Sequence, residues 1–377
     1  MAYSFSSQKS HPVFSNFFSS LKDPRRTTKG HHLYPLDEIL FLCISSVISG
    51  ANDWTTISLF GRTKLTWLRQ YLPYKNGIPS HDVLGKVFAA LDPVEFNHCF
   101  TKWVKSISEL TNGEVIAIDG KTICGSDDKQ TGKSALHVVS AYAAGNRLCL
   151  GQEAVNEKSN EITAIPALLK LLSIKDCVVT IDAMGCQKTI ADTIIDRGAD
   201  YVLMVKDNQQ ELKEQVEKVL SISCKTNSDQ QLDIGHGRIE KRDCLVTDEL
   251  TFMDVKEEWP GLKSVAKITS ERTDKQTGKK SIQDRYYISS LPAKAKVINK
   301  AIRSHWAVEN NLHWVLDVVF KEDGALKKKG NSALNFNIIA KMAIVMIDKE
   351  KENKKSKPNK RMLAALDDNY RTKIIKC

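Results

Sequence analysis

The segment Val115-Ile-Ala-Ile-Asp119 is a short apolar run that ends in an aspartate, and Cys177-Val-Val-Thr-Ile-Asp182 repeats this pattern farther along the chain. Short apolar runs rich in Val and Ile are typical of strands buried on both faces of a sheet. A single aspartate at a strand end is more often a turn former. Because two such runs each end in an acid, we expect neighbouring strands that bring both carboxylates to one sheet edge, where α/β proteins place their ligands.

The segments around these two strands predict how the sheet is built. The strands expected at 137–144 and 147–155 are joined by Gly145-Asn146, a two-residue turn typical of an antiparallel hairpin. The apolar spacing then predicts helix, strand, helix and strand in turn, at 161–172, 177–182, 187–197 and 201–205. This order predicts an α/β fold: a three-stranded meander followed by parallel strands in a mixed sheet with flanking helices, rather than a doubly wound nucleotide-binding fold.

The outer regions of the chain differ from this core. Residues 1–110 are predicted to form a helical N-terminal domain of four or five helices, because apolar residues recur there at helical spacing. A second domain is expected at 111–347, interrupted at about 221–292 by a β-rich insertion with short strands at 240–246, 264–268 and 284–289 between charged turns. Helical spacing resumes at 295–320 and 333–347, and residues 348–377 are left as a basic C-terminal tail.

The charge balance favours a polyanionic partner. Lys and Arg number 55 against 45 Asp and Glu, a formal net charge of +10, and phosphates release counterions when cations bind them. Seven Lys and Arg stand against two Glu between Lys349 and Arg361, a run that is typically a solvated tail and that is also suited to contact nucleic acid. Near the N-terminus, Arg25 and Arg26 lie in a basic loop that either grips phosphates or is a solvated connection.

The nine cysteines and the apolar stretches bear on compartment. The cysteines are scattered and form no CxxC pair, so neither a disulfide framework nor a structural zinc site is indicated. No stretch reaches the length of about 18 apolar residues that a membrane span needs. We therefore expect a cytoplasmic protein without a membrane partner.

A third acidic candidate lies in the helix predicted at 295–320. Glu309 is four residues from both His305 and His313, so the three share one helical face, with Trp residues beside them. A surface glutamate on an amphipathic helix is the commoner case, but two Trp and two His around an acid are unusual on a solvent face. The histidines are poor zinc candidates, because no HExxH motif or cysteine partner accompanies them.

Three carboxylates without softer ligands favour a hard divalent ion. Mg²⁺ or Mn²⁺ held by oxygen ligands is the chemistry of phosphoryl transfer, and two such ions serve both the attacking and the leaving oxygen without a covalent nucleophile. An ATPase is disfavoured, because Gly120-Lys-Thr lacks the glycine of a phosphate-binding loop five residues earlier, where Val115 stands.

Three blocks carry these acids in order: Asp119-Gly-Lys-Thr-Ile, Val179-Thr-Ile-Asp182-Ala-Met-Gly-Cys-Gln187 and Arg303-Ser-His-Trp-Ala-Val-Glu309-Asn-Asn-Leu-His-Trp-Val-Leu-Asp317. Together they resemble the catalytic blocks of H-repeat-associated transposases, insertion-sequence enzymes of the DDE type. The helical front part, with Asp23-Pro-Arg25 and Trp54, resembles the domain that precedes the catalytic core in that family. Cys124 and Asp207 differ from the family's usual Arg and Gly, but no triad acid is missing.

The resemblance implies an RNase H-like core in which Asp119, Asp182 and Glu309 form an acidic triad, with the β-rich insertion before the glutamate. It implies that Asp119 and Asp182 share one Mg²⁺ or Mn²⁺ and that Glu309 completes a second metal site. Further residues are expected to contact phosphates or support the triad: Lys121, Lys206, Arg303, His305 and His313.

The activity implied is that of a DNA transposase. It hydrolyses a phosphodiester at terminal inverted repeats and joins the freed 3′ end to target DNA, with double-stranded DNA as partner and a homodimer pairing the two ends. Two alternatives stay open: a structure-specific nuclease on the same core, and a DNA-binding protein whose catalytic activity has decayed.

Overall fold

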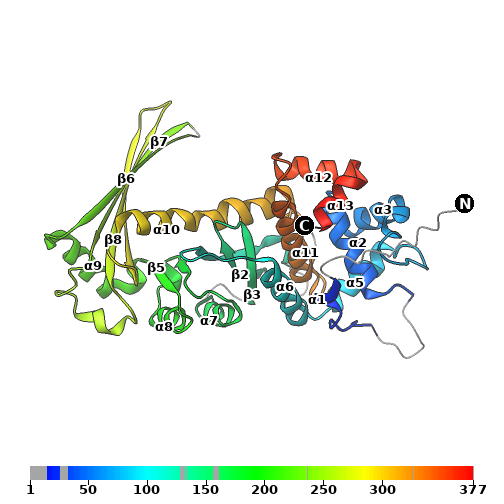
Figure 1. Cartoon of the computed structure of the whole chain (residues 1–377), viewed down its shortest axis with the longest axis horizontal. Coiled ribbons are helices and arrows are strands. Elements are labelled where there is room, and N and C mark those ends of the chain that lie inside the picture. The colour runs from blue at the N-terminus through cyan, green and yellow to red at the C-terminus, as the bar shows by residue number, and fades with distance from the viewer. Residues whose placement is uncertain are drawn as a thin grey trace, which may run out of the picture.

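A nine-stranded mixed sheet runs through the computed structural model, which describes residues 15–25, 33–127, 132, 134–155, 161–235, 237–325 and 327–376 (Figure 1). The strand order is β3-β2-β1-β4-β5-β9-β8-β7-β6. The bounds are β1 (Val115–Ile123), β2 (Leu136–Ala143), β3 (Leu148–Val155), β4 (Val178–Ile181), β5 (Asp200–Val205), β6 (Asn227–Gly235), β7 (Arg238–Thr247), β8 (Ser264–Asp274) and β9 (Lys280–Ser289).

The first five strands have the predicted arrangement. β1 pairs antiparallel with β2 and β2 with β3, while β4 is parallel to β1 and β5 is parallel to β4. The helices α7 (Glu161–Leu171) and α8 (Lys188–Asp196) connect the parallel strands. All four residues of β4 are buried, as its continuous apolar run predicts. The prediction of a meander followed by parallel strands in a mixed α/β sheet is therefore confirmed.

The β-rich insertion continues the core sheet rather than standing apart from it. β9 pairs antiparallel with β5, and β8, β7 and β6 follow outward. The sequence predicted segments of β7, β8 and β9 but neither β6 nor α9 (Gln210–Ile222). β6 is an edge strand with mostly exposed side chains, so it lacks the apolar alternation that predicts strands.

The N-terminal region is helical, as predicted. Its helices are α1 (Ser15–Phe18), α2 (Leu36–Ile48), α3 (Trp54–Thr63), α4 (Leu65–Leu68), α5 (His81–Ala90) and α6 (Pro93–Ile107). α2 is buried along nearly its whole length and packs against α11 (Ser332–Lys349). α11 also contacts β3, so one core joins the helical region to the sheet.

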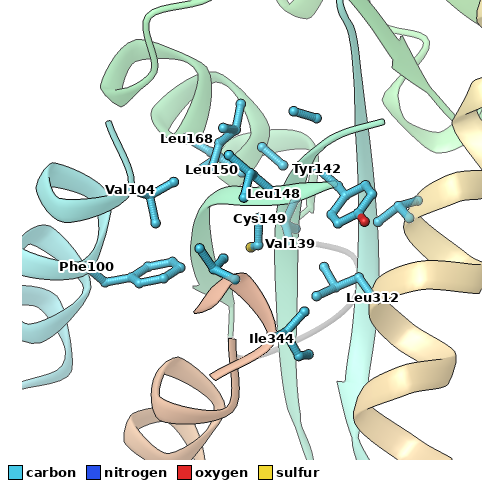
Figure 2. Packing of buried hydrophobic residues seen from close by; sticks show 14 of the residues in the cluster. Phe100, Val104, Val139, Tyr142, Leu148, Cys149, Leu150, Leu168, Leu312 and Ile344 are labelled. Carbon is cyan, nitrogen blue, oxygen red and sulfur yellow. The ribbon is translucent and has the colours of Figure 1, made fainter. Parts of the chain in front are cut away.

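Figure 2 shows this shared core from close by. Phe100 of α6, Leu168 of α7, Ile344 of α11 and Leu312 of the helix that follows β9 point toward the strands β2 and β3. All four side chains are fully buried. The sheet is thus fixed on both sides by apolar contacts, which makes it a rigid platform for side chains at its edge.

The C-terminal segment corrects the prediction of a solvated basic tail. Residues 357–376 form α12 (Lys357–Leu366) and α13 (Asp368–Lys376), which pack on α2 and α11 (Figure 1). Arg361 is buried and donates to the carbonyls of Val47 and Val319, and Arg371 is fully buried over the Trp67 ring. Carbonyl oxygens and aromatic rings, and for Arg371 the carboxylate of Asp368, contact these guanidinium groups and offset the cost of burying them.

A long helix lies across the sheet on the face opposite α7 and α8 (Figure 1). It begins as α10 (Ala295–Val308), which contacts β1 and β4, and continues as the π-helical segments η6 (Glu309–His313) and η7 (Val315–Val319). Short 3₁₀ turns complete the fold: η1 (Cys124–Ser126), η3 (Ala183–Gly185), η4 (Asp207–Gln209) and η5 (Asp254–Glu258). Within the described residues, no helix combines the length and apolarity that crossing a bilayer requires.

Candidate active site

The two predicted aspartates meet where β4 ends beside β1. The parallel register pairs Ile118 with Ile181, so Asp119 and Asp182 follow at adjacent positions. Asp119 is not at the end of its strand as the sequence suggested, because β1 continues to Ile123 in partnership with β2. Asp182 ends β4 and caps η3 by accepting the Met184 amide at 3.1 Å.

Glu309 and His313 reach the same place from the long helix. His313 Nδ1 lies 3.5 Å from Asp119 Oδ2 and 3.3 Å from Glu309 Oε2. Among the described residues, Asp119, Glu309 and His313 form a group whose ligand atoms all lie within 4.8 Å of one another. The sequence predicted a group of Asp119, Asp182 and Glu309, but the tight group contains His313 instead of Asp182. Asp182 lies beside this group, close enough for its charge to raise the pKa of Asp119.

The helix changes its winding at this point. The Trp314 amide donates to the Glu309 carbonyl and the Phe320 amide to the Val315 carbonyl, which are i→i+5 bonds of π-helix. Such wide turns inside helices are frequent at functional sites. Here His313 is buried, while the neighbouring Trp314 is 53% exposed. Glu309, with its side chain 54% exposed, is thus open to solvent between Trp306 and Trp314.

The electrostatics of the acids reflect crowding. Burial raises the pKa of Asp119 to about 6, with the charges of Asp182 and Glu309 adding to the rise and His313 opposing it. Glu309 differs, because the hydrogen bond from His313 lowers its pKa. Burial lowers the pKa of His305, whose Nδ1 lies 3.0 Å from Thr180 Oγ1. Like charges held this close disfavour full ionisation unless a cation joins them.

Behind Asp119, the glycine that follows it is held against a buried ion pair. A Cβ atom added to Gly120 would fall 2.8 Å from Glu161 Cδ and closer still to His137 Nε2. His137 and Glu161 are both buried and contact each other, and His137 Nδ1 lies 2.9 Å from Thr122 Oγ1. No sequence pattern indicated this pair. Only the need for glycine after Asp119 hinted that something packs closely there.

Lys121 contacts protein carboxylates. Its ammonium group lies 2.7 Å from Asp317 Oδ1, 3.1 Å from Glu322 Oε2 and 3.3 Å from Asp323 Oδ1. Burial lowers its pKa, but the charges of Glu322 and Asp317 outweigh burial and raise it overall. Because its side chain is only 10% exposed, Lys121 ties η7 and the following loop to β1, which suits the expected support of the triad better than a phosphate contact.

The other predicted residues lie farther out. Arg303 Nη2 is 3.4 Å from Asp233 Oδ2 on β6, and Lys206 is exposed after β5. Arg25 pairs with Asp23 and donates to the Tyr34 carbonyl at 2.7 Å, so it stabilises its own loop. Arg26 lies outside the described residues.

The donor set of the tight group fits a divalent cation. Two carboxylates and one imidazole converge from β1 and η6, and oxygen ligands with one nitrogen suit Mn²⁺ and accommodate Mg²⁺. The second ring nitrogen of His313 is buried without a hydrogen-bond partner among the described residues. Burying a polar ring nitrogen without a hydrogen-bond partner costs free energy. A cation held by Nδ1 and the two acids would offset part of this cost.

Comparisons with known proteins give the family of the chain. Residues 110–346 match the family model "Transposase DDE domain" and residues 15–104 match "DDE_Tnp_1-associated". The chain is 41% identical over 366 residues to "Putative transposase YncI" of Escherichia coli O157:H7, covering 96% of this chain and 93% of that protein. It is also 41% identical to "H repeat-associated putative transposase YhhI" of Escherichia coli (strain K12), covering 95% and 96%.

A solved structure of a piggyBac transposase synaptic complex with hairpin DNA is similar over 97% of this chain and 81% of that chain, at 13% identity and a TM-score of 0.45. That similarity is too distant to argue from. The family models and the curated relatives each span most of the chain, and the chain therefore belongs to the DDE transposase family.

Proposed function

We propose that this protein is a DNA transposase in which Asp119, Asp182 and Glu309 hold Mg²⁺ or Mn²⁺ for phosphodiester hydrolysis and strand transfer. The observation that carries the proposal is the convergence of Asp119 and Glu309, from segments far apart in the sequence, on one group beside Asp182. The β3-β2-β1-β4-β5 order supports an RNase H-like core. Membership of the DDE family supports the reaction class.

The residues of the site have separable tasks. Asp119 and Glu309 offer carboxylate oxygens and His313 a ring nitrogen, while Asp182 offers a further carboxylate from the adjacent strand end. When bound there, divalent cations supply Lewis-acid chemistry, which favours ionisation of a water or 3′ hydroxyl and stabilises the leaving oxygen. The exposed cations Arg303, which lies near Asp233, and Lys206 are proposed to contact DNA phosphates.

The rigid surroundings position these groups. β1 is fixed on one face by the His137–Glu161 pair and on the other by Lys121, which holds η7. His305, hydrogen-bonded to Thr180 of β4, fixes α10 next to Asp182. The acids are therefore held in place before DNA arrives, which lowers the cost of assembling the reactive geometry.

The test uses DNA that carries the terminal inverted repeat of the element within flanking sequence, together with a supercoiled target plasmid. With Mg²⁺ or Mn²⁺ we expect the wild-type protein to nick the repeat and to give covalently joined products. Asp182→Asn and Glu309→Gln should lose both activities while keeping DNA binding.

The outcomes separate the alternatives. Cleavage without joined products would identify a nuclease on the same core, and DNA binding without cleavage would identify a decayed transposase. An Asp182→Asn protein that cleaves as fast as wild type would overturn the assignment of the triad. Two DNA ends must be paired for transposition, so we further propose a homodimer on DNA.

A further inference from the structure

We propose a second DNA-contact site, a basic cleft between the β2–β3 turn and the segment 350–357, which binds the phosphate backbone of duplex DNA away from the acidic group. The cleft has a volume of about 400 Å³ and is lined by Arg147, Lys351, Lys354 and Lys355, together with residues of the start of α12. The inference rests on the proposed function, because it takes DNA to be the partner.

The acids of the cleft are already paired. Asp348 Oδ1 lies 2.8 Å from Lys357 Nζ. Glu350 is buried, with Oε2 3.0 Å from Lys360 Nζ and 2.8 Å from the hydroxyl of Tyr370. Lys357 and Lys360 therefore neutralise the acids of the cleft, and their charges are not available to a ligand.

Four cations remain for a ligand. Arg147, Lys351, Lys354 and Lys355 are exposed, and within the described part of the chain none of them forms an ion pair. Arg147 has a φ of 57°, a left-handed conformation that is uncommon for a residue other than glycine. The β2–β3 turn therefore places an arginine at the rim of the cleft, although the backbone conformation at this position does not favour an arginine.

The start of α12 adds to the positive potential. Pro358 stands in the first turn, and the side chain of Ser356 makes no capping hydrogen bond to the helix amides. Helix N-termini carry partial positive charge that favours anions. This feature alone would not define a site, but it adds to four unpaired cations in one cleft.

The chemistry of the lining identifies the ligand. Lysines on flexible stems act as point charges without fixed geometry, and the unpaired cations here are three lysines and one arginine. Such a surface suits sequence-independent contact with successive phosphates better than recognition of a base or a small phosphorylated metabolite.

The position of the cleft allows one duplex to reach both sites. The Ala144 amide donates to the Val115 carbonyl at 2.9 Å, so the turn lies beside the start of β1. Asp119 follows four residues later, about 13 Å along an extended strand. This distance is comparable to the major-groove width of about 12 Å, so the backbone on one side of a groove can lie at the cleft while the other side lies at the acidic group.

The experiment measures the salt dependence of binding to an arbitrary duplex of about 40 base pairs, four helical turns. Each phosphate contact contributes about 0.9 to the slope of log K against log salt. We expect the combined Lys351→Gln, Lys354→Gln and Lys355→Gln variant to lower the slope by about 1 to 3. Arg147→Gln alone, on the opposite rim, should lower it by about 1.

A charge-matched control removes three exposed lysines elsewhere, Lys170, Lys175 and Lys218, each replaced by Gln. Its slope should equal that of wild type. If the cleft variants keep the wild-type slope, or if the control loses as much slope as they do, the cleft is not a DNA site. Thermal melting checks the fold of each variant, and Arg147→Gln decides the matter if the triple variant melts early.

Failure of the proposed function gives a different result. In that case wild-type protein would show no metal-dependent cleavage, whatever its salt slope. Loss of slope in the cleft variants with wild-type cleavage still present supports both conclusions. If the cleft variants keep the wild-type salt slope while cleavage is present, only the proposal of a DNA site in the cleft is overturned.

Discussion

Asp119→Asn should make the metal-free protein more stable at neutral pH. In the folded protein, burial and the neighbouring charges of Asp182 and Glu309 raise the pKa of Asp119 to about 6, whereas an aspartate in an unfolded chain titrates near 3.9. The folded state therefore binds this proton more tightly, and wild-type stability falls as pH rises from about 4 through about 6.

The size of the effect follows from that shift. Two pKa units correspond to about 3 kcal/mol at most, and the side chain is 26% exposed, so about 1–3 kcal/mol is expected. Asparagine carries no charge at any of these pH values and can still accept the Gly120 amide, which donates to Asp119 Oδ1 at 2.9 Å. The stabilisation by Asp119→Asn should be absent near pH 4 and complete above about pH 7.

Urea unfolding in the presence of a chelator, repeated across this pH range, measures the difference. Asp207→Asn is the control of opposite sign, because the hydrogen bond from Lys213 lowers the pKa of Asp207; this variant should lose a little stability at neutral pH. Adding Mn²⁺ should stabilise the wild-type protein and not Asp119→Asn. A variant that is less stable than wild type at every pH would refute the reasoning, since it would mean that the carboxylate is stabilised by its surroundings.

Three further predictions concern the supports of the site. Gly120→Ala should destabilise the protein by about 1–3 kcal/mol and weaken Mn²⁺ binding, because the new Cβ overlaps the buried His137–Glu161 pair. Calorimetry measures this effect. The control is Gly85→Ala, whose Cβ meets only Trp54 at 3.5 Å; it should be neutral or stabilising by up to about 1 kcal/mol. Lys121→Met should cost about 3 kcal/mol in chemical unfolding, because the buried carboxylate of Glu322 loses its cation. Lys121→Arg should recover part of this loss. His313→Gln should reduce Mn²⁺ affinity about tenfold or more while changing Mg²⁺ affinity less, as titration calorimetry can show, because imidazole favours Mn²⁺; equal losses for both ions would exclude His313 as a ligand.

The sequence predicted the inner sheet because its strands are unambiguous. β4 and β5 are nearly all apolar and buried on both faces, and only such strands produce continuous runs. β6 gives no such signal, since its pairing with β7 on one side and solvent on the other leaves its side chains mostly exposed. Edge strands are set by the neighbour they pair with, which local periodicity does not contain.

The C-terminal helices were missed for a different reason. Their sequence reads as a solvated cationic run, yet Arg361 and Arg371 are buried, satisfied by carbonyls of α2 and η7 and by the rings of Phe320 and Trp67. Two of these partners, Val47 and Trp67, come from the N-terminal helices, far from the cations in the sequence. Charge composition therefore predicted solvent exposure where tertiary contacts produce burial.

The acids of the candidate site were found from strand ends and helix spacing, but the contact between His313 and Asp119 was not. It depends on the π-helical turn that starts at Glu309. In an uninterrupted α-helix, every residue after Glu309 would point in a different direction around the helix axis. No residue type in this stretch indicates the change from α- to π-helix. Helical spacing alone placed His305 and His313 equally, whereas the structure brings His313 to Asp119 and leaves His305 against Thr180.

The charges around the acidic group argue that it requires an external cation. The charge of Lys121 lowers the pKa of Glu309, but less than His313 does, because Asp317, Glu322 and Asp323 already pair with its ammonium group. His313 can supply at most one positive charge to Asp119, Asp182 and Glu309 together. Three acids and one imidazole leave a net negative charge in a partly buried site, and such a site is stable only when protonated or when occupied by a metal ion. Because the strands and the helix fix these groups in place, the folded protein bears the cost of their mutual repulsion, and a bound divalent cation would offset it.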